Sequence, residues 1–170
     1  MEVLHSKRLE IRPLLVAEYP AAVEVYRSNP DFMVRISGHP LDSINLKLVE
    51  EETKEAAAHG ALYCGIFLRG GKQLIGVATF ERSRSIDRTA AWIALLLIVG
   101  PQQSQGYGTE AYQAVEQFIF IDLSVHSIEL GVLPANKSGK EFWKSLGYQE
   151  IEPVEPADVS RICLMRKNRR

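Results

Sequence analysis

The sequence predicts one domain of the mixed α/β or α+β class. Helical hydrophobic patterns lie near the front, a meander of antiparallel strands follows, and strands then alternate with helices. The length of 170 residues suits a single domain, so we expect residues 1–170 to fold together. A chain of this size, 46% hydrophobic, can bury a core without a disulfide or a structural metal.

The first third of the chain predicts one short strand and two helices. Leu9–Pro13 alternates apolar and polar residues and ends at a proline, which is typical of a short strand. Val16–Arg27 carries apolar residues at helical spacing. A second helix is expected to run to Gly60, with Asp42 or Ser43 as its N-cap.

The middle of the chain predicts an antiparallel meander. Leu62–Leu68 and Leu74–Phe80 are expected to pair through a tight turn at Gly70–Gly71, because glycine supplies the positive φ that a two-residue hairpin needs. Thr89–Val99 is nearly all apolar near its end, which predicts a strand that is buried on both faces.

The remainder of the chain predicts alternating helices and strands. The expected order is helix Thr109–Ile121, strand Ser127–Val132, helix Ser138–Leu146, strand Tyr148–Ile151 and strand Ile162–Met165. Ser138 and Glu141 fit a capping box, in which each side chain satisfies a backbone amide at the helix start. Gly147 is expected to end that helix.

The charge balance argues against a nucleic-acid partner. Twenty basic and 21 acidic residues give a net charge of −1, whereas nucleic-acid affinity depends on neutralising phosphates with a broad cationic surface. The acidic stretch Glu50–Glu52 is expected on the solvated face of its helix.

Location and metal content are also constrained. The N-terminus lacks an apolar signal core, and the longest apolar run, Ala90–Val99, is shorter than the roughly 20 residues of a membrane span. We therefore expect a cytoplasmic protein with no membrane partner. Cys64 and Cys163 form no CxxC pair, and Cys64 is expected in a buried strand. The four histidines lack metal-ligand spacing, so we expect no metal.

The loop Gly100–Gly108 is the most informative stretch. A buried strand leads into it, and it opens a helix. Helix N-termini carry unpaired N–H groups and partial positive charge, and glycine lets the backbone approach a ligand closely. This combination predicts a cradle for an anion, most naturally a phosphate. The alternative is an ordinary turn that uses glycine for backbone geometry.

Two nucleotide-binding alternatives are weaker. Gly106–Ala111 formally matches the dinucleotide fingerprint GxGxxA, which keeps a dinucleotide-binding oxidoreductase open. In that fold the unit usually comes first, whereas a meander precedes it here. The acid expected about 20 residues on would be Glu129, which lies inside its strand. No GxxxxGK[ST] motif is present, which argues against a P-loop protein.

The stretch Gln103-Ser104-Gln105-Gly106-Tyr107-Gly108 resembles the Q/R-x-x-G-x-G/A signature of the GNAT superfamily of acyl-CoA-dependent N-acyltransferases. Downstream segments also resemble that family, namely Glu129–Val132, Pro134–Asn136, Phe142–Trp143 and Leu146–Tyr148. The resemblance implies a mixed, mostly antiparallel central sheet of six to seven strands flanked by about four helices. Its fourth and fifth strands, here Thr89–Val99 and Ser127–Val132, would splay apart.

The resemblance also implies cofactor-binding residues for acetyl-CoA, which acts as co-substrate. The pyrophosphate would bind to the backbone amides of Gln103, Ser104, Gln105, Gly106, Tyr107, Gly108 and Thr109. The pantetheine arm would pair with the backbone of Leu97, Ile98 and Val99. Asn136 matches the family asparagine near the pantetheine; its alternative role is that of a turn or cap residue.

The chain departs from the family pattern at the expected general acid. Many members have a tyrosine seven positions after the asparagine, whereas this chain has Trp143, whose indole is no useful acid. Trp143 is expected either to wall the pantetheine or to pack in the helix. Tyr148, Tyr107 and Ser138 are candidates to replace the acid, and Tyr148 is retained as a candidate catalytic residue.

The general base is a second open position. The strand Thr89–Val99 carries no carboxylate. Glu81 ends the preceding strand and is the first candidate, with Glu129 and His39 as alternatives.

These features predict an N-acetyltransferase. It would move an acetyl group from acetyl-CoA to a primary amine of a protein N-terminus, a polyamine or another small molecule, by direct attack on the thioester. In style the chain resembles the branch of protein N-terminal alanine and spermidine N-acetyltransferases. A non-catalytic acyl-CoA binding or sensing module is the alternative, and the protein is expected to be a monomer or homodimer.

Overall fold

The computed structural model describes residues 1–36, 38–70, 73–82, 89–151 and 162–169. These residues form one eight-stranded sheet in the order β1-β2-β3-β4-β5-β6-β8-β7, flanked by four α-helices. All neighbouring strands are antiparallel except β5 and β6. The expected mixed, mostly antiparallel α/β architecture is confirmed.

The element bounds follow the predicted order closely. The strands are β1 Leu4–His5, β2 Leu9–Pro13, β3 Leu62–Leu68, β4 Leu74–Arg82, β5 Ala90–Ile98, β6 Ser127–Val132, β7 Gln149–Glu150 and β8 Cys163–Asn168. The α-helices are α1 Tyr19–Arg27, α2 Leu46–Ala58, α3 Tyr107–Ile121 and α4 Lys137–Ser145. A short π-helix, Phe32–Ile36, and three 3-10 turns, Val16–Glu18, Leu41–Ser43 and Gly100–Gln102, complete the set. Seven of these strands were predicted from the sequence; the additional strand is β1, which has only two residues.

Three local predictions are corrected. The N-cap of α2 is Asn45, because Asp42 and Ser43 lie in a separate 3-10 turn that ends before the helix starts. The predicted capping box at Ser138 is wrong, because Asn136 caps α4 and accepts a hydrogen bond from the Gly139 amide. At the hairpin turn, Gly70 has the expected positive φ of 77°, while Gly71 lies outside the described residues.

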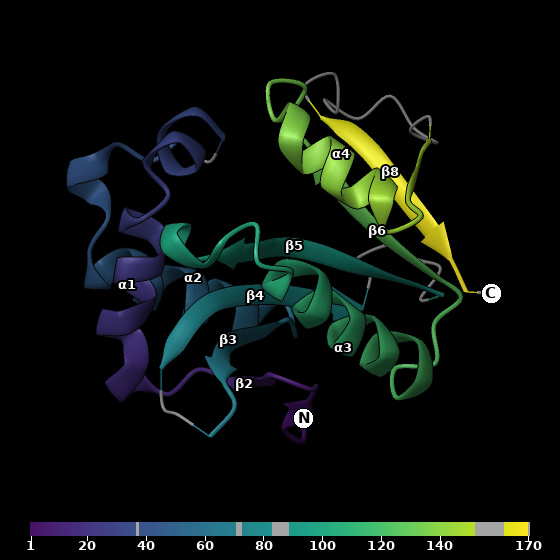
Figure 1. Ribbon diagram of the computed structural model, residues 1–170, viewed down its shortest axis with the longest axis horizontal. Coiled ribbons are helices and arrows are strands. Elements are labelled where there is room, and N and C mark those ends of the chain that lie inside the picture. Colours follow the sequence, from purple (N-terminus) through teal and green to yellow (C-terminus); the bar gives the residue numbers. More distant parts are fainter. Residues whose placement is uncertain (37, 71–72, 83–88, 152–161, 170) are drawn as a thin grey trace.

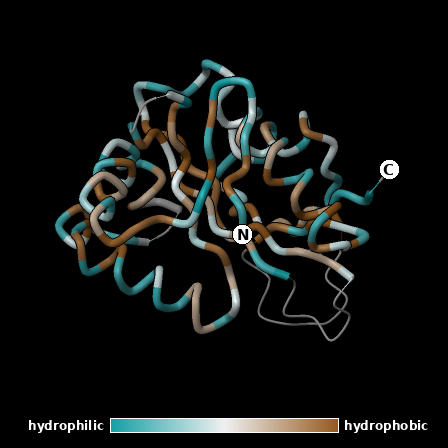
Figure 2. The backbone as a smooth tube through the Cα atoms, turned by 90° about the horizontal axis from the view of Figure 1, so that it is seen from below, coloured by the Kyte–Doolittle hydropathy of each residue, from teal (hydrophilic) through white to brown (hydrophobic). Residues whose placement is uncertain are grey.

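The helices cover the two faces of the sheet and enclose two hydrophobic cores (Figure 1). On one face α1 and α2 pack over the middle strands around Tyr26, Val49 and Phe67. On the other face α3 and α4 pack around Tyr112 and Trp143. Hydrophobic segments gather between the helices and the sheet (Figure 2). None of the helices within the described residues has the length and apolar character that crossing a membrane requires.

The sheet divides between β5 and β6, as the resemblance implied. These two parallel strands pair only where Ala90–Ile93 lies beside Ser127–Leu130, although β5 continues to Ile98. The paired residues of β4 jump from Thr79–Leu95 to Phe80–Ile93, which leaves Ala94 as the extra residue of a β-bulge. The bulge follows directly on the last β5–β6 pair, and beyond it the two strands diverge (Figure 1). The division therefore starts at a bend in β5.

The predicted burial of both faces of β5 is wrong in the middle of the strand. Ala94 is exposed, and Leu95 and Leu96 are half-buried. The reason is the loss of the β6 neighbour, which opens this part of the strand to a cavity.

The corrected N-cap gives a stability prediction. Asn45 Oδ1 accepts a hydrogen bond of 2.9 Å from the Lys47 amide, so Asn45→Ala should lower the free energy of unfolding by about 1 kcal/mol. Asp42→Ala is the matched control and should change it by less than about 0.5 kcal/mol, because Asp42 is exposed. Urea denaturation measures both. A larger loss for Asp42→Ala would contradict the assigned cap.

Candidate functional site

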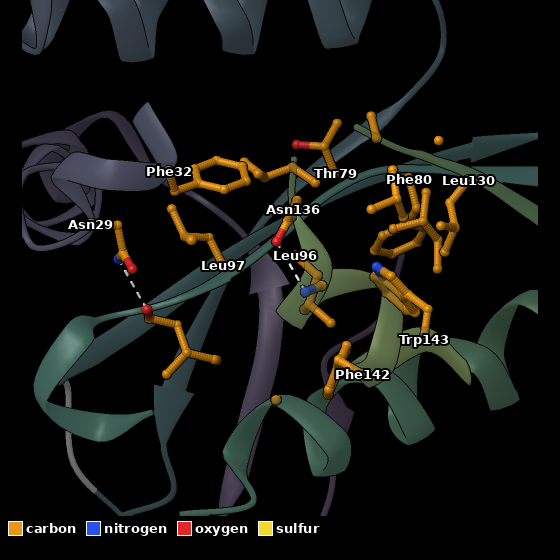
Figure 3. Close-up of a pocket in the computed structure, with 18 of the residues that line it drawn as sticks. Asn29, Phe32, Thr79, Phe80, Leu96, Leu97, Leu130, Asn136, Phe142 and Trp143 are labelled. Atoms are coloured by element: carbon orange, nitrogen blue, oxygen red, sulfur yellow. Dashed lines mark hydrogen bonds between the residues drawn. The ribbon is translucent and has the colours of Figure 1, made fainter. Parts of the chain in front are cut away.

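A cavity of about 1440 Å³ lies where β5 and β6 part. This volume exceeds the roughly 300–1,000 Å³ of a typical small-molecule pocket, so the cavity has room for a long ligand and a second molecule. Its lining comes from both faces of the sheet (Figure 3). Phe142 and Trp143 from α4 border one side, and Asn29 and Phe32 from the segment after α1 border the other.

The loop before α3 contributes Ser104, Gly106, Gly108 and Thr109 to the lining of this cavity. Gly106, at the N-cap, has φ 81° and ψ 0°, and no side chain caps the helix. Tyr107, Gly108 and Thr109 form the first turn, whose amides have no partner within a helix. Among the described residues, none accepts a hydrogen bond from an amide of 104–109. N–H groups without acceptors at the positive end of a 15-residue helix are the feature that the predicted anion cradle requires.

Gln103 differs from the other predicted cradle residues. Its backbone N–H donates to the Gly100 carbonyl at 3.1 Å. Its side-chain amide donates to Asn29 Oδ1 at 2.6 Å and to the Ile98 carbonyl at 2.8 Å. Gln103 therefore ties the loop to β5 and to the segment after α1, instead of offering its amide to a ligand.

Arg8, which was not predicted as a site residue, fixes the position of the loop. Its guanidinium donates to the Gln105 carbonyl at 3.2 Å and lies 4.2 Å from the centre of the Tyr107 ring. It also pairs with Glu110 at 2.6 Å, and Ser6 donates to the same carboxylate at 2.7 Å. Burial raises the pKa of Glu110, but the hydrogen bonds from Ser6 and Arg8 outweigh burial and hold that pKa below its ordinary value.

Along the edge of β5 that faces the gap, every second residue directs its backbone N–H and C=O groups toward the cavity. The Val99 amide donates to the Ile75 carbonyl at 2.8 Å, so Val99 and, two residues earlier, Leu97 direct their backbone groups to β4. Ile98 and Leu96 therefore direct theirs to the gap. Of the three residues predicted to pair with pantetheine, only Ile98 has this orientation, and it shares the orientation with Leu96. The Ile98 carbonyl already accepts from Asn29 and Gln103.

The two candidates at α4, Asn136 and Trp143, both line the cavity. Asn136 lines the cavity and caps α4 through Oδ1, so its alternative role as a cap is realised. Trp143 also lines the cavity, with 9% of its surface exposed, and packs edge-on against Tyr112 at 5.4 Å. Trp143 therefore packs against the core, and its place in the cavity lining is the one that its predicted pantetheine role requires.

The structure does not bring Tyr148 to the cavity. Tyr148 is 3% exposed and lies behind Trp143, with its hydroxyl oxygen 3.3 Å from that of Tyr112. Burial raises the pKa of Tyr148 well above its ordinary value. Of the two alternatives, Ser138 lines the cavity, whereas Tyr107 stacks beneath Arg8.

The base candidates are also distinguished by position. Glu81 is 5% exposed and lines the cavity. Glu129 is paired with Arg166 at 2.6 Å, and neither Glu129 nor His39 lines the cavity. Glu52, which was expected on the solvated face of α2, lines the cavity instead. Cys64 is fully buried as predicted, and burial raises its pKa to about 12, so it is not a nucleophile.

Comparisons with known proteins agree with this geometry. One relative is the probable N-acetyltransferase YjcK of Bacillus subtilis, 27% identical over 154 residues, which cover 87% of this chain and 84% of the relative. The structure resembles a Salmonella typhimurium acetyltransferase that modifies the N-terminal serine of ribosomal protein L7/L12, with a TM-score of 0.78, 14% identity and coverage of 99% and 100%. It also resembles the PaiA N-acetyltransferase of Thermoplasma acidophilum in complex with coenzyme A, with a TM-score of 0.68, 17% identity and coverage of 95% and 99%.

The family assignment rests on the sequence itself. Residues 8–149 match the acetyltransferase (GNAT) domain, a match that includes β2 through β6 and all four α-helices and ends at the first residue of β7. The dinucleotide-binding oxidoreductase is thereby set aside. The chain belongs to the GNAT acetyltransferase family and is an acyltransferase with acetyl-CoA as its co-substrate.

Proposed function

We propose that this enzyme transfers the acetyl group of acetyl-CoA to a primary amine in the cavity between β5 and β6. The observation that carries the proposal is the run of amides at 104–109, which have no acceptor among the described residues and lie beside the parted strands. A diphosphate is the anion that such a cradle at a helix N-terminus suits. The amine belongs to a small molecule or to a peptide N-terminus. The enzyme acts in the cytoplasm as a monomer or homodimer.

The parts of the cavity divide the work of binding. The amides of Ser104–Thr109 hold the diphosphate. The gap-facing backbone of Leu96 and the N–H of Ile98, whose carbonyl is already bonded, align the extended pantetheine as an additional strand would be aligned. Phe142 and Trp143 wall the other side. The acyl end then lies near the bulge of β5, where N–H groups that face the gap stabilise negative charge on the carbonyl oxygen.

The chemistry needs a base more than an acid. Direct transfer needs an uncharged amine, whereas an amine in water at neutral pH is mostly protonated. The departing thiol has an ordinary pKa near 8.5 and leaves readily as thiolate. Trp143 in place of the usual tyrosine is therefore compatible with turnover.

The acceptor class is inferred from chemistry and from relatives. Carboxylates from three elements line the cavity on the α1–α2 side: Asp31, Glu52, Glu55 and Glu81. Such a wall suits a cationic amine. The Salmonella relative acts on a protein N-terminus, which supports a peptide acceptor as one member of this class. Polyamines are the other candidates.

The test is release of free thiol from acetyl-CoA with a panel of peptides, polyamines and aminoglycosides. We expect saturable turnover with at least one cationic amine. Trp143 favours one rival, a non-catalytic acyl-CoA sensing module. Saturable coenzyme A binding with no turnover across the panel would support that rival and overturn the proposal.

Gly106→Ala should weaken coenzyme A binding about tenfold, equivalent to about 1.4 kcal/mol. The left-handed backbone at Gly106 (φ 81°) disfavours any side chain, so alanine strains the loop that carries the amides, although its Cβ would make only an ordinary contact of 3.4 Å with Arg8 Nη2. Calorimetric titration with coenzyme A measures the change. Gly70→Ala is the control, since it has φ 77° and open space around its Cβ but lies in the β3–β4 turn. Equal affinities of Gly106→Ala and Gly70→Ala would contradict the cradle.

Trp143→Tyr should leave the fold intact and keep turnover equal to that of the parent or raise it up to about tenfold, because the new hydroxyl supplies a proton donor beside the leaving thiol. Trp143→Phe is the matched control, which keeps a ring without a donor. The kcat for thiol release and circular dichroism are measured for both. A large fall in kcat for a folded Trp143→Tyr protein would instead assign a specific role to the indole.

A further inference from the structure

Glu52 occupies an unusual position on α2. Leu48, Glu52 and Ala56 are spaced by four residues and share one face of the helix, and Leu48 and Ala56 are buried in the core. Its neighbours Glu50 and Glu51 are exposed, and Glu51 pairs with Lys47 at the surface. Glu52 is half-buried and lines the cavity. Of the three consecutive glutamates, Glu52 is thus the one that the fold places at the cavity.

Two buried tyrosines hold the Glu52 carboxylate in place. The Tyr26 hydroxyl donates to Glu52 Oε2, and the hydroxyl oxygens of Tyr26 and Tyr63 lie 2.6 Å apart. Tyr26 is 1% exposed and Tyr63 is 6% exposed, so their rings are fixed by packing. A carboxylate braced in this way keeps one orientation toward the cavity.

The sheet connects this cluster to the place where the strands part. Tyr63 on β3 is paired with Thr79 on β4, and Thr79 is paired with Leu95 on β5, next to the Ala94 bulge. Neighbouring strands lie about 4.8 Å apart, so two strand spacings separate Tyr63 from Leu95. Glu52, Tyr63, Thr79 and Leu95 all line the same cavity. The carboxylate and the parted strands therefore face one shared space.

We propose that Glu52 is the general base for the acceptor amine, and that Tyr26 and Tyr63 are positioning residues that aim its carboxylate. This inference rests on the proposed function. Glu52 removes one proton from the ammonium group, directly or through a water molecule. The freed nitrogen lone pair forms the N–C bond as the C–S bond breaks, the sulfur leaves with the bonding electrons, and the second nitrogen proton passes to solvent or to the thiolate. Glu52 then returns its proton to solvent.

The surroundings of Glu52 suit a base. Burial is the largest effect on the pKa of the Glu52 carboxyl and raises it. Hydrogen bonds from Tyr26 and Tyr63 and the charge of His39 lower this pKa, and the charge of Glu55 raises it. The net result is a raised pKa. A higher pKa makes the carboxylate a better proton acceptor near neutral pH. Burial also raises the pKa of Tyr26 and Tyr63, so both stay protonated as donors.

The test compares Glu52→Gln with Glu50→Gln, using the panel acceptor that the wild-type enzyme turns over best. Glutamine keeps an oxygen for the tyrosine hydroxyls but accepts no proton. At pH 7 we expect Glu52→Gln to lower kcat/KM about 100-fold and Glu50→Gln to leave it unchanged. Tyr63→Phe should cause a smaller loss, with the acidic limb of the pH profile displaced.

The pH profile separates a base from a structural residue. Wild-type kcat/KM should fall as the pH drops through the raised pKa of Glu52, because the protonated form accepts nothing. Glu52→Gln should lose this limb and recover toward wild type as the pH approaches the pKa of the amine. A defect equal at all pH values, or an unaltered kcat/KM, would refute the assignment.

Coenzyme A binding distinguishes the two possible failures. Calorimetry should give the same coenzyme A affinity for wild type and Glu52→Gln, which also shows that the variant is folded. Absence of turnover by the wild-type enzyme would overturn the proposed function and this inference together. Turnover by wild type and Glu52→Gln at equal rates would overturn this inference alone. If Glu52→Gln fails to fold, an unaltered acidic limb in Tyr63→Phe overturns it instead.

Discussion

The loss of one strand neighbour organises the functional half of the molecule. Among the described residues, β5 has partners on both sides from Ala91 to Ile93, and beyond the Ala94 bulge its outer edge faces a gap. An unpaired edge is a row of N–H and C=O groups that needs partners, and an extended ligand can supply them. The end of β5 leads along the chain into the loop that opens α3. In the proposed function, the strand edge and the anion cradle are therefore consecutive parts of one binding path.

The loop at the end of β5 is held without using the amides of residues 104–109. Gln103 fastens it to Ile98 and Asn29, while Arg8 fastens it to β2 and to Glu110. Side chains and carbonyl groups carry these bonds. The N–H groups of residues 104–109 are thus oriented in advance, and a ligand meets a site whose conformational entropy has already been lost on folding.

Local patterns predicted the cradle and most elements, because their causes lie within a few residues. The glycines at 106 and 108, the buried strand before them and the helix after them are adjacent in the sequence. Arg8 and Glu52 escaped prediction for the opposite reason. Arg8 meets Gln105 across 97 positions, and Glu52 meets Tyr26 across 26. For Glu52 one signal existed, since it falls on the apolar stripe of Leu48 and Ala56.

Two features have one chemical explanation: Trp143 stands in place of the usual tyrosine, and Glu52 lies at the cavity. The reaction needs a proton acceptor for the amine more than a proton donor for the thiolate. A thiol ionises near neutral pH, so its departure gains little from an acid. An amine whose pKa lies well above 7 must be deprotonated before it can attack, and only a group near the acceptor can help. On this reasoning a proton donor at position 143 adds little to the rate, whereas a proton acceptor on the α2 side adds more. A tryptophan that packs with Tyr112 and Tyr148 is tolerated on one wall, while the opposite wall keeps a half-buried carboxylate despite the desolvation that raises its pKa.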